Sequence, residues 1–136
     1  MGVFSKLFGT KKQDLPIARL TGNGKYELEA VGESAYQKSF LKITGGKTED
    51  GHQMKIEAIL VHNDKNPYDN KAVVVSIDGD IVGYLSKKDA RKFRKLMADA
   101  GGPGSPAVCD ALIVGGWDRG GGDEGYFGIR LDLPLE

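Results

Sequence analysis

Clusters of glycine divide this chain into short segments, and they restrict its fold more than any other feature of the sequence. The chain holds 20 glycines in 136 residues. Many occur together, as in Gly101-Gly102, Gly115-Gly116 and Gly120-Gly121-Gly122. Clustered glycines mark turns, and frequent turns favour a β-rich fold. The length fits one domain, which can bury a core without disulfides or metals.

Six segments between these turns have the residue pattern of strands. Residues 25–31 alternate polar and apolar side chains, and residues 71–77 are rich in β-branched side chains. Asp78-Gly79 follows the latter segment and is a strong hairpin signal. The predicted strands cover residues 25–31, 52–62, 71–77, 81–85, 107–114 and 126–133.

Two further segments have helical spacing. Residues 34–43 place apolar side chains at near-helical intervals, with Ser34 as the predicted N-cap. The clearer helix begins at Ser86, where Asp89 three residues later approximates a capping box, and it stops at Gly101-Gly102-Pro103. Its apolar stripe consists of Ala90, Phe93, Leu96, Met97 and Ala100.

The elements predict a mainly β fold with two helices, in the order strand, helix, three strands, helix, two strands. A small, mainly antiparallel barrel of six strands fits the short connections. We expect residues 25–136 to form this domain. Residues 1–24 are expected to form a flexible tail and linker, with an apolar part that contains Val3, Phe4, Leu7 and Phe8.

Composition argues against several classes of function. The formal net charge is zero, so nucleic-acid binding would need a local basic patch. Cys109 is the single cysteine, which suits a reducing compartment and leaves no Cys-x-x-Cys pair for zinc. His52 and His62 lie about 33 Å apart along an extended strand, too far to share a metal. The sequence therefore predicts a cytoplasmic protein with no enzymatic activity, no metal, no cofactor and no membrane span.

The stretch from Asn66 to Val75 is the first candidate for a binding site. Pro67 stiffens the turn before the strand and would present Tyr68 and Asp69 at its mouth. An exposed tyrosine offers a flat face for stacking a base, and a neighbouring aspartate accepts a hydrogen bond from a hydroxyl but repels phosphate. Alternatively, Asn66 and Asp69 cap their own turn and Tyr68 packs on it.

The second candidate is the helix that begins at Ser86. Within residues 86–96 only Asp89 opposes its basic residues, and such a patch would follow phosphates and bind more weakly as salt increases. A solvated helix face with no ligand is the alternative. The basic residues are Lys87, Lys88, Arg91, Lys92, Arg94 and Lys95.

Together these stretches resemble the HIRAN domain family. Its hallmark is an Asn-Pro-Tyr-Asp-x-Asn/Lys-Ala-hydrophobic run, a short hairpin, and a Val-Gly-Tyr/His-Leu step into a helix. Residues 66–75 and 82–85 match this pattern, and Val31-Gly32, followed by Tyr36-Gln37, resembles the first strand and turn. The resemblance covers about residues 25–133 and implies an OB-like β-barrel.

The resemblance also implies roles for individual residues. A family member fused to a fork-remodelling ATPase captures the 3′-hydroxyl end of single-stranded DNA. By position, Tyr68 would stack on the terminal base, Asp69 would bind the hydroxyl and Asn66 would shape the turn. Ser34 and Ala35 stand where that member has arginine and tyrosine, so the resemblance implies the loss of one phosphate contact and one stacking surface, for which Tyr36 and Lys38 would substitute in part. The implied nucleic-acid-binding residues are Tyr36, Asn66, Tyr68, Asp69, Lys71, Tyr84, Lys87, Lys88 and Arg91.

Two functions follow as hypotheses. The first is a DNA-repair module that binds single-stranded DNA or 3′ ends and works with a helicase, a nuclease or another repair protein. It expects Tyr68, Asp69 and Tyr84 to line one exposed groove beside the basic helix. The second is a protein-interaction module without nucleic-acid binding. It expects an exposed apolar patch or edge strand, with Tyr68 packed and Asp69 bonded within its own turn.

Overall fold

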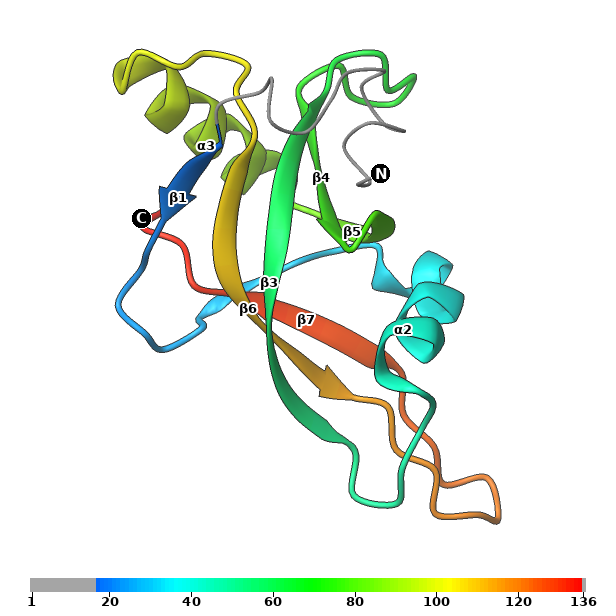
Figure 1. Ribbon diagram of the computed structural model, residues 1–136. Helices are drawn as coiled ribbons and strands as arrows, with labels where there is room; N and C mark the ends of the chain where they lie inside the picture. The colour runs from blue at the N-terminus through cyan, green and yellow to red at the C-terminus, as the bar shows by residue number, and fades with distance from the viewer. Residues whose placement is uncertain (1–16, 136) are drawn as a thin grey trace.

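A curled, mainly antiparallel sheet forms the body of the molecule, and two helices pack against it (Figure 1). The computed structural model describes residues 17–135. A 3-10 helix, Glu33–Tyr36, leads directly into α2 (Gln37–Thr44), and α3 spans Lys87–Asp99. The strands are β1 (Ala18–Leu20), β2 (Leu28–Glu29), β3 (His52–Asn63), β4 (Ala72–Ile77), β5 (Asp80–Tyr84), β6 (Ala107–Gly115) and β7 (Phe127–Leu131).

The long strand β3 is the centre of the sheet. Its residues 52–60 pair with β6, and its residues 59–63 pair with β4, both in antiparallel register. The strand order is β2-β7-β6-β3-β4-β5, with β1 alongside β6 in parallel. Because β3 has different partners along its length, the sheet curls and brings its outer strands towards each other (Figure 1).

The curled sheet is closed by a short backbone contact between its two ends. The Val31 N–H donates to the Tyr84 carbonyl at 2.8 Å, and the Tyr84 N–H donates to the Val31 carbonyl at 2.9 Å. On the other side, the Ala30 N–H donates to the Ile129 carbonyl at 3.2 Å. Residues 28–31 therefore connect β7 to β5 and join the two ends of the curled half-barrel sheet.

One hydrophobic core fills this barrel and reaches under both helices. Phe40 of α2 stacks on Phe127 of β7, with ring centroids 5.5 Å apart and planes inclined by 2°. From α3, Ala90, Phe93 and Met97 enter the same core. The apolar stripe predicted for this helix is confirmed at these three positions, and the Asp89 N–H donates to the Ser86 hydroxyl as expected of a cap.

The mainly β class with two helices is confirmed, and each of the six predicted strands overlaps an observed one, with β3, β5 and β6 each extending one residue beyond the predicted bounds. The structure adds β1, which lies inside the segment expected to be tail and linker. It is ordered because its three residues pair with Ala107 to Cys109 of β6. Residues 1–16, with the apolar N-terminal side chains, lie outside the described part of the chain.

The start of the first helix differs from the prediction. Gly32, at a φ of 75°, precedes the 3-10 turn, and no side-chain cap is formed by Ser34. Side-chain contacts instead attach this end of the helix to β7: the Gln37 side chain accepts from the Phe127 N–H at 2.8 Å and donates to the Phe127 carbonyl at 3.0 Å. The Glu33 carboxylate accepts from the Ile129 N–H at 3.2 Å.

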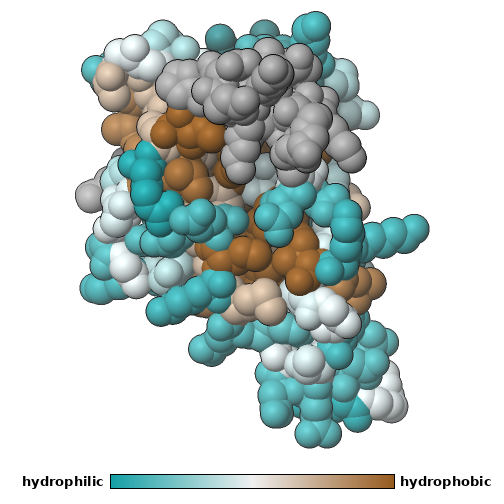
Figure 2. Space-filling view, in the orientation of Figure 1, coloured by the Kyte–Doolittle hydropathy of each residue, from teal (hydrophilic) through white to brown (hydrophobic). Residues whose placement is uncertain are grey.

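The surface is uneven in character. In Figure 2, hydrophobic surface lies over the middle of the face shown, whereas the projecting lower end is largely hydrophilic. That end corresponds to the connections that precede β3 and follow β6 in Figure 1. Among residues 17–135, no helix is long and apolar enough to cross a membrane.

Substituting Gly83 tests the closure. A Cβ at Gly83 would lie 2.9 Å from the Val31 carbonyl oxygen, which is backbone and cannot turn aside. We expect Gly83→Ala to lower the free energy of unfolding by about 1–3 kcal/mol and to accelerate hydrogen exchange of the Val31 amide.

Gly128→Ala is the control, because a Cβ there meets its nearest atom, Glu33 Oε2, at 3.4 Å. Urea unfolding and amide exchange measure both effects. Equal stability of the two variants would contradict the close approach at the closure.

Candidate nucleic-acid interface

A groove of about 550 Å³ lies beside the closure of the barrel. Four segments build it: the end of β5 with Val31, the 3-10 helix, the turn between β3 and β4, and the first turn of α3. We call it the tyrosine groove, because three of the five tyrosines line it. Its polar and aromatic lining residues include Tyr36, Asn66, Tyr68, Asp69, Tyr84 and Lys87.

Tyr36 and Tyr84 form a fixed aromatic pair in this groove. Their ring centroids are 6.2 Å apart, and the planes are inclined by 47°. The closure holds Tyr84 through its backbone, and the 3-10 helix holds Tyr36. Hydrogen bonding with the Tyr84 side chain, followed by partial burial, raises the pKa of Tyr36. The two rings therefore lie next to each other in the groove.

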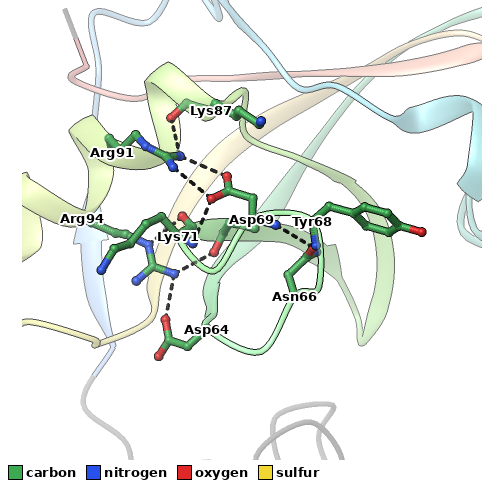
Figure 3. A network of polar contacts seen from close by, with 9 residues as sticks. Asp64, Asn66, Tyr68, Asp69, Lys71, Lys87, Arg91 and Arg94 are labelled. Carbon is green, nitrogen blue, oxygen red and sulfur yellow. Dashed lines mark hydrogen bonds and ion pairs between the residues drawn. The ribbon is translucent and has the colours of Figure 1, made fainter.

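Tyr68 stands out from its turn into solvent. The Asn66 side-chain oxygen accepts from the N–H groups of Tyr68 and Asp69, at 2.9 and 3.2 Å. This local bonding fixes the turn, yet the Tyr68 residue is 91% exposed. Figure 3 shows its ring pointing away from the polar network. The expectation that Tyr68 packs on its own turn is therefore wrong, although Asn66 does cap the turn as that alternative expected.

Asp69 is held by two partners. Arg91 donates to both of its oxygens, Nη1 to Oδ2 at 3.0 Å and Nη2 to Oδ1 at 2.9 Å, and the Lys71 N–H donates to Oδ1 at 3.0 Å (Figure 3). These bonds hold the pKa of Asp69 at about 2, chiefly through Arg91. A carboxylate has about four acceptor positions. Three are in use, so one on Oδ2 remains for a ligand.

Two arginines of the basic helix connect α3 to the turn. Arg91 also donates to the Lys87 carbonyl, at 3.2 Å. Arg94 donates to the carbonyls of Lys71 and Ala72, at 2.7 and 2.9 Å, and its Nη2 lies 2.8 Å from an Asp64 oxygen. Two of the six basic residues that the sequence offered for a phosphate-binding patch are therefore engaged within the protein. The sequence carried one signal for these contacts, because both positions hold arginine rather than lysine. The planar guanidinium group of arginine suits hydrogen bonding to carboxylates and carbonyls.

The structure gathers six of the nine predicted binding residues in the tyrosine groove. Lys87 is the only lysine of α3 among them. The remaining three do not line it: Lys88 is exposed on the helix, Arg91 lies behind Asp69, and Lys71 lies on the other side of the turn. Leu85 and Lys65 also line the groove and were not predicted.

Charge distinguishes this groove from a larger one of about 870 Å³. The larger groove is lined by Glu27, Glu29 and Asp89, which repel phosphate. Buried Asp132 accepts there from the N–H groups of Gly22 and Gly24, which makes it a structural residue. Within residues 17–135, no three His, Cys, Asp or Glu side chains are placed to hold a metal ion.

No protein-family model matches the sequence, and no curated protein matches it. Among solved structures, the chain is similar to the crystal structure of the HIRAN domain of human HLTF. The identity is 18%, the match covers 80% of this chain and 74% of that one, and the TM-score is 0.39. That domain comes from the family that the motifs of the sequence resemble.

The Arg91–Asp69 contact can be tested by titration. The folded-state pKa of Asp69, about 2, lies below its ordinary value of 3.8. Its contribution to stability is therefore present above about pH 4 and is lost as the pH falls through 2. In Arg91→Gln we expect the pKa to rise towards 3.8, as followed by the ¹³C shift of the carboxyl carbon. Lys87→Gln is the comparison and should raise the pKa of Asp69 less, because the Lys87 charge is the smallest of the causes that lower this pKa. An unchanged titration in Arg91→Gln would contradict the assignment.

Proposed function

We propose that this protein binds single-stranded DNA in the tyrosine groove, with preference for a 3′-hydroxyl end, and that it does so without catalysing a reaction. The observation that carries the proposal is the exposure of Tyr68 on a rigid turn beside the Tyr36–Tyr84 pair and Lys87. Bases of any sequence stack on aromatic faces, and lysine neutralises the adjacent phosphate. The groove combines both chemistries within one site.

Asp69 would supply the preference for a free 3′ end. Its low pKa keeps it ionised, so it only accepts hydrogen bonds. The remaining acceptor position on Oδ2 suits a terminal hydroxyl, whereas a terminal phosphate would be repelled by the carboxylate charge. The access is narrow, because the Asp69 side chain is only 13% exposed.

In this proposal the protein is a tethering or sensing module. Its activity in DNA repair would depend on a partner such as a helicase or a nuclease, and we place it in the cytoplasm. The buried thiol of Cys109, whose pKa burial raises to about 12, fits a structural residue rather than a nucleophile.

The second candidate is a protein-interaction module. Two observations favour it: Asp69 is bonded within its own turn and to Arg91, and hydrophobic surface is visible on one face of the molecule (Figure 2). The full exposure of Tyr68 is compatible with either function. Binding measurements separate the two.

Fluorescence anisotropy with labelled single-stranded DNA tests the proposal. We expect Tyr68→Ala to weaken binding about 5- to 150-fold, which corresponds to the loss of one stacked base at roughly 1–3 kcal/mol. Tyr126→Ala is the matched control, because Tyr126 is exposed as well, at 70%, but does not line the groove. Equal affinity of these two variants, or no binding by the unmodified protein, would favour the protein-interaction module.

The end preference needs a separate comparison. We expect DNA with a 3′-hydroxyl to bind more tightly than the same strand with a 3′-phosphate, because the Asp69 charge opposes the phosphate. Asp69→Asn should reduce this difference. If both strands bind equally to the unmodified protein while Tyr68→Ala still weakens binding, the groove binds single strands without recognising their ends.

A further inference from the structure

A second cavity, of about 620 Å³, lies across the Asn66–Lys71 turn from the tyrosine groove. We call it the basic cavity. It lies between the end of β3, the start of β4, α3 and the loop that follows α3. Its lining residues are His62, Asn70, Lys71, Arg91, Arg94, Lys95, Pro103 and Gly104.

The charge of the basic cavity is positive. Four of its lining side chains are cationic and none is a carboxylate. Arg91, Arg94 and Lys95 each contact one aspartate nearby, and Lys71 makes no ion pair among the described residues. The four cations and their three aspartate partners therefore leave an excess of one positive charge, which lies on Lys71.

The four cations differ in their freedom to meet a ligand. Arg94 is held by two carbonyls, and its side chain is 18% exposed, so it contributes a fixed charge in the wall. The Lys95 side chain is 76% exposed and pairs with Asp99 one helical turn away. Exposed pairs of this kind contribute little and are screened by salt. Lys71 and Lys95 can therefore turn towards an anion at small cost.

His62 forms part of the wall and is a natural reporter of the cavity. Its ring lies 5.6 Å from that of Phe93, and its Nδ1 is buried without a hydrogen-bond partner among the described residues. Burial first, and then the nearby Arg94 charge, lower the pKa of His62, while a backbone hydrogen bond with Gly104 and then the Asp64 charge act in the opposite direction. An anion placed among these cations would change the field at this ring.

The position of the basic cavity connects it to the proposed site. Asp69 lines the tyrosine groove, whereas Lys71 and Arg91 line the basic cavity, and both of them donate hydrogen bonds to Asp69 (Figure 3). We propose that the basic cavity is a second phosphate site, which holds the backbone of the same single strand where it continues beyond the tyrosine groove. This inference rests on the proposed function and adds a longer footprint to it.

The first test uses inorganic phosphate and the two histidines of the chain. We expect the ¹⁵N and ¹H imidazole signals of His62 to shift and saturate as phosphate is added at constant ionic strength. His52 is an internal control, because its ring packs on Phe127 and its Nδ1 lies 3.0 Å from the Gly115 oxygen, among residues that do not line the basic cavity. No shift of His62, or equal shifts of both rings, would overturn the phosphate site.

The second test compares oligonucleotides of about four and about sixteen nucleotides, the usual range of site sizes for an OB fold. In Lys71→Gln/Lys95→Gln we expect the long strand to bind roughly tenfold more weakly, and its salt slope to fall by about 1.4, the value for two lost contacts to a single strand. The short strand, which the tyrosine groove accommodates alone, should keep its affinity.

A control variant with the same change of charge is Lys25→Gln/Lys55→Gln, in which neither lysine lines the groove or the basic cavity. It should bind the long strand like the unmodified protein. Equal losses in the two double variants, or no loss in either, would overturn the second site while leaving the tyrosine groove intact. If neither oligonucleotide binds to the unmodified protein, the proposed function fails. A saturable His62 shift would in that case assign the basic cavity to free phosphate, and the proposed path of the DNA through it would be overturned.

Discussion

Two backbone hydrogen bonds between Val31 and Tyr84 hold together the parts on which the tyrosine groove depends. They connect residues near the start of the fold to β5, and so join the two ends of the curled half-barrel sheet. Gly83 allows this approach, because a side chain there would meet the Val31 carbonyl. As a result, Tyr84 faces Tyr36, which would otherwise lie on an unconnected edge of the sheet.

Arginine bonding is the second constraint, and it divides the basic helix into two kinds of residue. Arg91 and Arg94 fix the turn between β3 and β4, whereas Lys87, Lys88 and Lys92 make no ion pair among the described residues. The contacts that hold this turn leave Tyr68 91% exposed. The order of the turn and the exposure of its tyrosine thus come from the same set of contacts.

Local patterns in the sequence were sufficient for most of the elements. The alternation in residues 52–62 and the β-branched run in residues 71–77 predicted β3 and β4. Both patterns can be recognised from neighbouring residues alone. Ser86 was predicted as a cap for the same reason. In contrast, β1 has three residues and exists because β6 offers it a backbone edge, and the start of α2 depends on contacts between Gln37 and Phe127. Neither feature has a local signal.

For the candidate site, the sequence by itself determined the chemistry of the turn: an Asn66 cap, a stiff Pro67, and Tyr68 and Asp69 side by side. Tertiary structure alone decided how these groups are used. It placed Arg91, which is 22 residues away along the chain, on Asp69, and it separated Lys71 from the groove by the width of the turn. The physical reason is that backbone preferences act between neighbours, whereas ion pairs, ring contacts and cavities form between segments that only the completed barrel brings together.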